Sequence, residues 1–147
     1  MRPTSDSGRG AGRQHSATAL GMLSRIGLTS DEVLVRLRPL VPETVRVKPA
    51  PRWLRAFMNP RVSAITLPWA VYLRAEVIAL PEAVLGRLML HELVHARQWK
   101  ELGTLRFTVR YLREYLAGRR RGLGHWGSYL AISLEQEAAR AESILES

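Results

Sequence analysis

The stretch from Pro81 to Gly103 constrains the fold more than any other part of the chain, because a strong helix pattern there contains three polar residues at a defined spacing. Proline is favoured at the first position of a helix, and glycine is common just past the last one. Between these two residues, apolar side chains recur at helical spacing, at Val84, Leu85, Leu88, Leu93 and Val94. The sequence therefore predicts an amphipathic helix that buries one face in a core.

Within this helix lies the sequence His91-Glu92-Leu93-Val94-His95. Residues four apart lie one turn apart on the same face, so His91 and His95 can bind one metal ion. Glu92 lies about 100° around the axis from His91 and flanks that ion, where a general base is needed. Because the chain has no cysteine, thiolate ligands are excluded. Two imidazoles, a carboxylate and a water suit Zn²⁺, and the pattern predicts a zinc-dependent hydrolase.

A third protein ligand has to come from a later segment. The longer HExxHxxGxxH pattern is ruled out, because Gln98 and Glu101 stand where it requires glycine and histidine. Glu101 and Glu114 fit poorly as ligands, and the remaining candidates are His125, Glu135, Glu137 and Glu142. Glu135 and Glu137 lie about 200° apart around a helix, so only one of them can face the metal. Small residues after Glu135 favour it, whereas the apolar stripe of that helix lies closer to Glu137.

Three segments resemble a known group of enzymes. His91 to Gln98 resembles the HELxHxxQ helix of small bacterial zincins of the gluzincin type. The segments Ala64-Ile65-Thr66-Leu67 and Val71-Tyr72-Leu73 resemble the strands before that helix in the metallopeptidase domain associated with contractile injection systems. Leu134-Glu135-Gln136-Glu137-Ala138 resembles the ExEA or ExxA(D/N) segment of those proteins and of the ImmA/IrrE-type peptidases, although Ala139 replaces the usual Asp or Asn. The resemblance covers roughly residues 64 to 142.

This resemblance implies a zinc-dependent peptidase that acts on a peptide or protein substrate. His91, His95 and Glu135 would bind Zn²⁺, with Glu137 as the alternative third ligand, and Glu92 would be the catalytic base. The segment Val62 to Leu67 would be an edge strand that pairs with the substrate. Tyr111, Tyr129 and His125 are candidates for stabilising the oxyanion, and the substrate-binding residues are otherwise unassigned.

The expected fold is α+β and zincin-like, with a small antiparallel or mixed sheet preceding the HExxH helix and two further helices. The expected strands are Thr44–Lys48, Val62–Leu67 and Trp69–Leu73, and the further helices are Thr104–Ala117 and Trp126–Leu145. Residues 1–28 are expected to be a disordered or weakly ordered basic tail, with a short amphipathic piece at Ala19–Ile26. Residues 29–147 form the expected zincin-like metallopeptidase domain.

The formal net charge of +9 supports a second interpretation, a basic protein that binds nucleic acid or another anionic surface. Its candidate surface combines Arg106, Arg110, Arg113 and Arg119–Arg121 with the interleaved aromatic residues Phe107, Tyr111 and Tyr115. No nucleic-acid motif accompanies these residues, so this alternative is not favoured. A third interpretation is a zinc-stabilised interaction domain that has no catalytic activity.

The hydropathy pattern predicts no membrane span. The best apolar run, Val62 to Leu80, is interrupted by Pro68, Arg74 and Glu76, whereas a span needs about 20 mostly apolar residues. No apolar stretch follows a basic start at the N-terminus, so the sequence predicts no signal peptide. A cytoplasmic location is expected, with export by a specialised system left open, and nothing indicates the oligomeric state.

Overall fold

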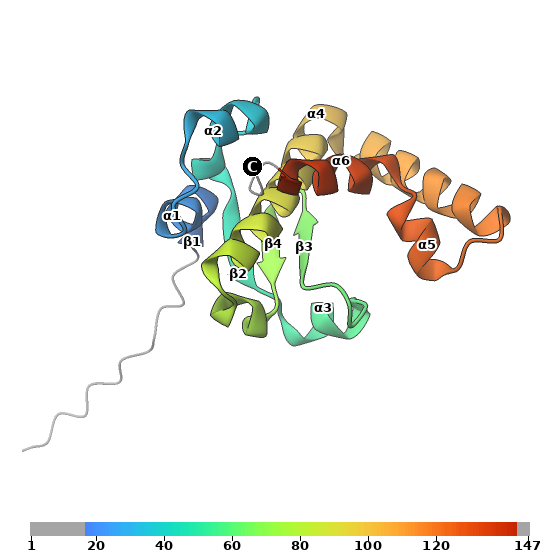
Figure 1. Ribbon diagram of the computed structural model, residues 1–147. Helices are drawn as coiled ribbons and strands as arrows, with labels where there is room; N and C mark the ends of the chain where they lie inside the picture. The colour runs from blue at the N-terminus through green and yellow to red at the C-terminus, as the bar shows by residue number, and fades with distance from the viewer. Residues whose placement is uncertain (1–16, 144–147) are drawn as a thin grey trace, which may run out of the picture.

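The computed structural model describes residues 17–143, which form a mixed α+β fold around a small mixed sheet (Figure 1). The strands are β1 (Ala17–Thr18), β2 (Arg46–Pro49), β3 (Ala64–Leu67) and β4 (Ala70–Leu73), in the order β1-β2-β4-β3. β2 and β4 are parallel, and the other two neighbouring pairs are antiparallel. The expected α+β class is therefore confirmed, and β3 lies at an edge of the sheet.

The two faces of the β3–β4 hairpin pack against different helices, because successive side chains of a strand point to opposite sides. Ala64, Val71 and Leu73 belong to the main core, together with the buried face of α4 (Glu82–Arg120). Ile65 and Tyr72 pack on the opposite face, in a smaller cluster beneath α3 (Arg52–Phe57). Thr66 has the same parity as Ala64 and therefore faces α4.

The long helix α4 is interrupted at Gly103, whose φ of 73° no other part of the helix shares. Glycine adopts positive φ without the steric cost that a side chain would bring. Residues 82–102 pack against the sheet, and residues 104–120 continue away from it as an arm at the right of Figure 1. The two expected helices on either side of Gly103 are therefore confirmed.

The last predicted helix, Trp126–Leu145, is divided in two within the described residues. α5 (His125–Leu130) ends before Ala131, and α6 (Ser133–Glu142) begins two residues later. Glu114 from the arm pairs with the start of α6, because its carboxylate accepts hydrogen bonds from the Ser133 N–H at 2.6 Å and the Ser133 hydroxyl at 2.8 Å. The uncapped donors at the start of α6 are thus paired by another helix. Residues 144–147 lie outside the described residues.

Residues 17–28, which fall within the expected tail, pack against the rest of the fold. β1 pairs with β2, and α1 (Ala19–Arg25) follows with Ala19 and Leu23 wholly buried in the main core. Thr18 caps α1 by accepting a hydrogen bond from the Gly21 N–H at 3.2 Å. Residues 17–28 are therefore part of the domain, and the remainder of the expected tail, residues 1–16, lies outside the described range.

The remaining connections complete the main core. α2 (Asp31–Leu37) buries Val33 and Leu37 there, and short 3₁₀ turns follow at Pro42–Thr44 and Ala75–Ala79. Within residues 17–143, no helix combines the length and the apolar character that crossing a bilayer requires.

Candidate metal centre

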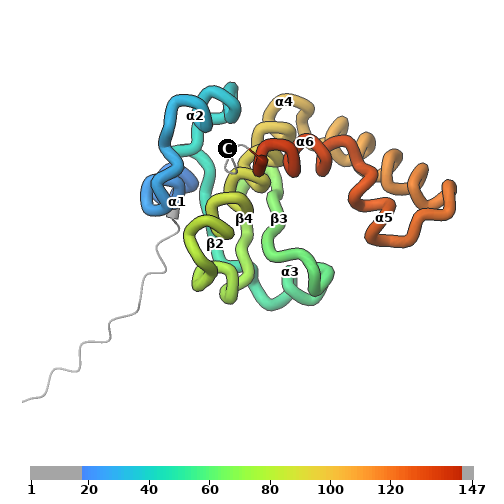
Figure 2. The backbone as a smooth tube through the Cα atoms, in the orientation of Figure 1, coloured from blue at the N-terminus to red at the C-terminus, as the bar shows by residue number. Residues whose placement is uncertain are grey.

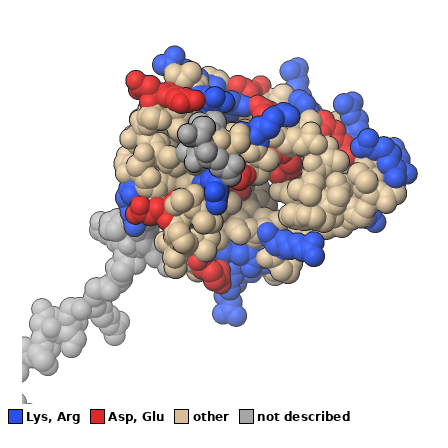
Figure 3. Space-filling view, in the orientation of Figure 1, with Lys and Arg blue, Asp and Glu red and all other residues tan. Residues whose placement is uncertain are grey.

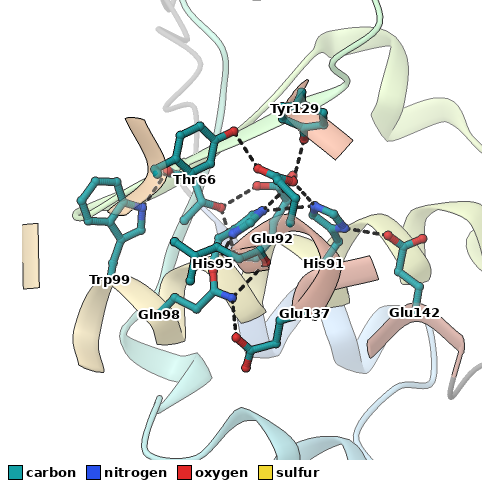
Figure 4. A network of polar contacts seen from close by, with 12 residues as sticks. Thr66, His91, Glu92, His95, Gln98, Trp99, Tyr129, Glu137 and Glu142 are labelled. Atoms are coloured by element: carbon teal, nitrogen blue, oxygen red, sulfur yellow. Dashed lines mark hydrogen bonds and ion pairs between the residues drawn. The ribbon is translucent and has the colours of Figure 1, made fainter. Parts of the chain in front are cut away.

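Three side-chain atoms from two helices lie close together, and Figure 4 shows the two histidines of this group with the polar contacts around them. His91 Nε2 and His95 Nε2, both on α4, lie 3.2 Å apart, and Glu135 Oε2 on α6 lies 3.3 Å from each of them. The red helix α6 lies alongside the yellow part of α4, which holds this arrangement in place (Figure 2). A tetrahedral zinc site with bonds of about 2.0–2.1 Å separates its ligand atoms by about 3.3–3.4 Å. The observed triangle thus has the size of one face of such a site.

The other ring nitrogen of each histidine is held by an acceptor. His91 Nδ1 donates to Glu142 Oε1 at 2.6 Å, and His95 Nδ1 donates to Gln98 Oε1 at 2.8 Å. The Gln98 amide cannot be reversed, because its nitrogen donates to the Leu134 carbonyl at 3.1 Å and to a carboxylate of α6. With their Nδ1 protons held by these acceptors, both rings have Nε2 as the atom that can bind a metal ion in place of a proton, as in metal-binding histidines.

The electrostatics of this cluster favour a positive charge at its centre. Burial lowers the pKa of His91, but hydrogen bonds to Glu135 and Glu142 outweigh burial and raise that pKa to about 10. Burial raises the pKa of Glu135, but its hydrogen bonds to His91 and His95 outweigh burial and hold the pKa well below its ordinary value. Three electron-pair donors at contact distance repel one another unless a cation or protons lie between them. The donor set therefore fits a divalent metal ion.

Two tyrosine hydroxyls fix the carboxylate of Glu135. Tyr111 on the arm donates to Oε1 at 2.8 Å, and Tyr129 on α5 donates to Oε2 at 2.7 Å. Burial, together with the charge of Glu135, raises the pKa of both phenols, so both remain protonated donors. Two of the three residues considered for the oxyanion are therefore next to the cluster. The third, His125, is away from it and accepts or donates a hydrogen bond with Tyr115 at 2.7 Å.

Glu92 is buried on the sheet side of the histidines. Its Oε2 accepts a hydrogen bond from the Thr66 hydroxyl on β3 at 2.7 Å. Burial raises the pKa of Glu92, although the neighbouring His95 and the Thr66 bond oppose the increase. A carboxylate with a raised pKa beside these imidazoles is suited to accept and return a proton near neutral pH. Sequence analysis predicted the place of Glu92 on the helix but not its partner Thr66.

A cleft of about 360 Å³ opens beside these residues, between β3 and the arm. Glu92, His95 and Glu135 are the charged groups in its described lining, and its walls are otherwise largely apolar or aromatic. Trp99, Phe107 and Tyr111 form a stacked row along one wall, with ring centroids 3.8 Å and 5.8 Å apart. The cleft thus presents a largely apolar surface beside Glu92, His95 and Glu135.

The other candidate ligands from the sequence have different roles. Glu137, the alternative third ligand, forms an ion pair with Arg97 and accepts from the Gln98 amide at 2.9 Å, so it is turned away from the histidines. Glu142 accepts the hydrogen bond of His91 Nδ1, on the side of the ring opposite to Nε2. The support that Gln98 gives to His95 was not predicted from the sequence. The signal was present, because Gln98 lies three residues after His95 and thus on the same helix face.

The structure also places the aromatic residues that the nucleic-acid interpretation used. Phe107 is buried, and Tyr111 and Tyr115 are bonded to Glu135 and His125, so these rings face the inside of the arm. They therefore lie apart from the exposed arginines of the arm, and Phe107 and Tyr111 line the cleft instead.

The chain matches no family model, no curated protein and no solved structure. A function for it has to be inferred from the residues of the site themselves.

Proposed function

We propose that this protein is a zinc-dependent peptidase with a zincin-like fold, in which His91, His95 and Glu135 bind the ion. The observation that carries the proposal is the triangle of two Nε2 lone pairs and one carboxylate oxygen, with sides of 3.2 to 3.3 Å. Its support by Glu142 and Gln98 is the kind of outer hydrogen bonding that fixes metal-binding imidazoles. Two histidines with one carboxylate are the ligand set of catalytic zinc, which keeps a further position for water or substrate.

The residues around this site suit amide hydrolysis. Zn²⁺ would supply a Lewis acid there, polarising the substrate carbonyl and lowering the pKa of water. Glu92 takes the proton from the attacking water and returns it to the leaving nitrogen, and the Thr66 hydroxyl holds its carboxylate in position. Tyr129 lines the cleft and donates its hydroxyl proton to Glu135 Oε2, and it would have to leave that bond to donate to the carbonyl oxygen as negative charge develops there.

The edge strand β3 supports a polypeptide substrate. Ser63 O accepts a hydrogen bond from Arg74 N at 3.0 Å, so Ser63 and Arg74 are a hydrogen-bonded pair of the antiparallel ladder. Because hydrogen-bonded and non-hydrogen-bonded pairs alternate along such a ladder, the N–H and C=O groups of Ala64 and Thr66 point away from β4. The Thr66 carbonyl accepts from the Trp99 indole at 3.1 Å, and the Ala64 groups face the cleft side. An extended peptide can add to such an edge through main-chain hydrogen bonds.

Metal analysis of the purified protein, combined with hydrolysis of a fluorogenic peptide library, tests the proposal. We expect about one zinc ion per chain, as a three-ligand site implies. Glu92→Gln should keep the zinc and reduce hydrolysis by at least about 100-fold, the usual contribution of a general base. Glu135→Gln should lose the zinc, whereas Glu137→Gln, two residues along the same helix, should keep it. A metal-free wild-type protein that does not respond to added zinc would contradict the proposal.

A second outcome separates catalysis from structural metal binding. If zinc binds to the wild-type protein and Glu135→Gln removes it, but no peptide of the library is hydrolysed, then the domain is metal-stabilised and non-catalytic. In that case Glu92→Gln should leave the zinc content and the zinc-dependent melting temperature unchanged.

A further inference from the structure

The outer face of the arm carries a continuous row of exposed aliphatic side chains. These are Leu105, Val109, Leu112 and Leu116, with 77, 54, 53 and 49% of their surface exposed. Their spacing of four, three and four residues places them on one face of the helix. The opposite face of the arm is the one that packs against α5 and α6, through Phe107, Tyr111 and Tyr115. We call the four aliphatic residues the arm face.

A row of arginines runs beside the arm face. Arg106, Arg113 and Arg120 follow one another at intervals of seven residues, so they lie along one line of the helix, and all three are exposed. Arg119 and Arg121 add to the positive charge where the arm ends, and basic side chains gather at that end in the space-filling view (Figure 3). The arm thus has the composition of a helix that lies in a membrane interface, aliphatic on one side and cationic beside it.

A second exposed apolar surface meets the arm face at the mouth of the cleft. Trp53 and Phe57 lie four residues apart on α3, with 61 and 85% of their surface exposed. Phe57 and Leu112 both line the cleft, on opposite sides of it. Arg52 and Arg55, which are exposed on α3, accompany these rings. Aromatic residues next to arginines are typical of protein surfaces at the level of lipid headgroups.

We propose that the arm face and α3 dock this protein onto an anionic lipid bilayer, with the mouth of the cleft at the membrane surface. The aliphatic side chains would enter the boundary between headgroups and acyl chains, and the arginines would pair with anionic headgroups. A second copy of the chain is a poorer partner, because each copy carries a net charge of +9. Nucleic acid would pair with the arginines through its phosphates but would leave most of the aliphatic row exposed. This proposal is independent of whether the protein hydrolyses peptides.

Co-sedimentation with vesicles tests the docking surface. We expect the protein to bind vesicles of phosphatidylcholine mixed with phosphatidylglycerol, and to bind vesicles of phosphatidylcholine alone much more weakly. The double variant Leu105→Ser/Val109→Ser should weaken binding by at least about 10-fold, because it removes apolar area from the interface. Neither residue lines the cleft. The matched control is Val35→Ser/Ile78→Ser, which changes side chains of similar exposure elsewhere and should bind like the wild type.

The same assay separates the arginine row from the net charge. Arg106→Gln/Arg113→Gln/Arg120→Gln should weaken binding by roughly 100-fold, from the usual contribution of three basic residues at an anionic surface. Replacing three exposed arginines elsewhere, at Arg25, Arg38 and Arg46, removes the same charge and should have a much smaller effect. Equal losses in the two triple variants would contradict the proposal, because the attraction would then belong to the whole protein.

The absence of cysteine allows a direct measurement of insertion. A polarity-sensitive fluorophore on Val109→Cys should shift to shorter wavelength with anionic vesicles, whereas the same fluorophore on Val35→Cys should not. A label at position 109 that is already shielded without vesicles, in a protein that sediments as a dimer, would assign the arm face to a second copy. Binding of a DNA oligonucleotide that needs the arginine row but tolerates Leu105→Ser/Val109→Ser, without vesicle binding, would also overturn the membrane proposal.

Discussion

Gln98 connects the histidine pair to α6, and its replacement by methionine isolates that connection. The Gln98 side chain is almost fully buried and makes three hydrogen bonds, one accepted from His95 Nδ1 and two donated to Leu134 O and Glu137 Oε2. Methionine has a similar length and volume, so the packing change is small. The substitution therefore removes polar contacts and little else.

The expected destabilisation follows from these contacts. The N–H of His95 would be left buried without its partner, which costs about 1–3 kcal/mol. Each of the two lost donor bonds adds about 0.5–1.5 kcal/mol, which gives roughly 2–6 kcal/mol in total. The lower half of that range is expected, because the Glu137 side chain is 42% exposed and can bind water instead. Zinc affinity should fall by about 10- to 100-fold, because His95 loses the contact that fixes its ring.

Urea unfolding in the presence of a chelator measures the first effect, and zinc titration against a competing dye measures the second. The control is Gln136→Met on the exposed side of α6, where only the exposed bond to the Leu130 carbonyl is lost and the free energy of unfolding should change by less than about 1 kcal/mol. If Gln98→Met is as stable as the wild type and binds zinc equally well, the role assigned to the Gln98 amide is wrong.

Glu142→Gln should reduce zinc affinity by about 10- to 100-fold with little loss of stability, because it weakens the carboxylate contact to His91 Nδ1. Gly118→Ala should lower the free energy of unfolding by about 1–3 kcal/mol, since a Cβ there would lie 2.9 Å from the Ser128 backbone. Gly124→Ala is the control, because a Cβ at that position would meet no atom within 4 Å. Removal of zinc by a chelator should lower the melting temperature of the wild type but not that of Glu135→Gln. Burial raises the pKa of Glu114, but hydrogen bonds from the start of α6 outweigh burial and lower that pKa. The ionised Glu114 should therefore stabilise the fold at neutral pH, and this stabilisation should be lost as the pH falls and the carboxylate is protonated. Glu114→Gln should remove this pH dependence of the free energy of unfolding, measured by urea titrations at a series of pH values.

Much of the site follows from local rules. The spacing of His91 and His95 on a helix is enough to place both rings on one face, and the structure has both there. The interruption at Gly103 is likewise local, because glycine adopts a positive φ that other residues avoid. The β3–β4 hairpin follows from two short β-rich runs separated by Pro68. Each of these features depends on residues within a few positions of one another.

Contacts between distant segments decided what the sequence left open. The apolar stripe of α6 favoured Glu137 as a ligand, but Leu134 and Ala138 are the residues that pack inward, and Glu137 lies beside Arg97 on α4. The first residue of α6, Ser133, is paired by Glu114, a residue 19 positions before it. The inclusion of residues 17–28 depends on β1 pairing with β2. None of these contacts has a local signal.

The sequence by itself determined that the imidazoles of His91 and His95 and the carboxylate of Glu92 lie on one short helical segment, because helix periodicity alone sets the directions of these side chains. Only the tertiary structure brought Glu135 to within 3.3 Å of both rings, and only the tertiary structure placed the arm along one side of the cleft. The physical reason is that the rotation of one helix against another is set by the packing of both surfaces, which a single segment does not encode.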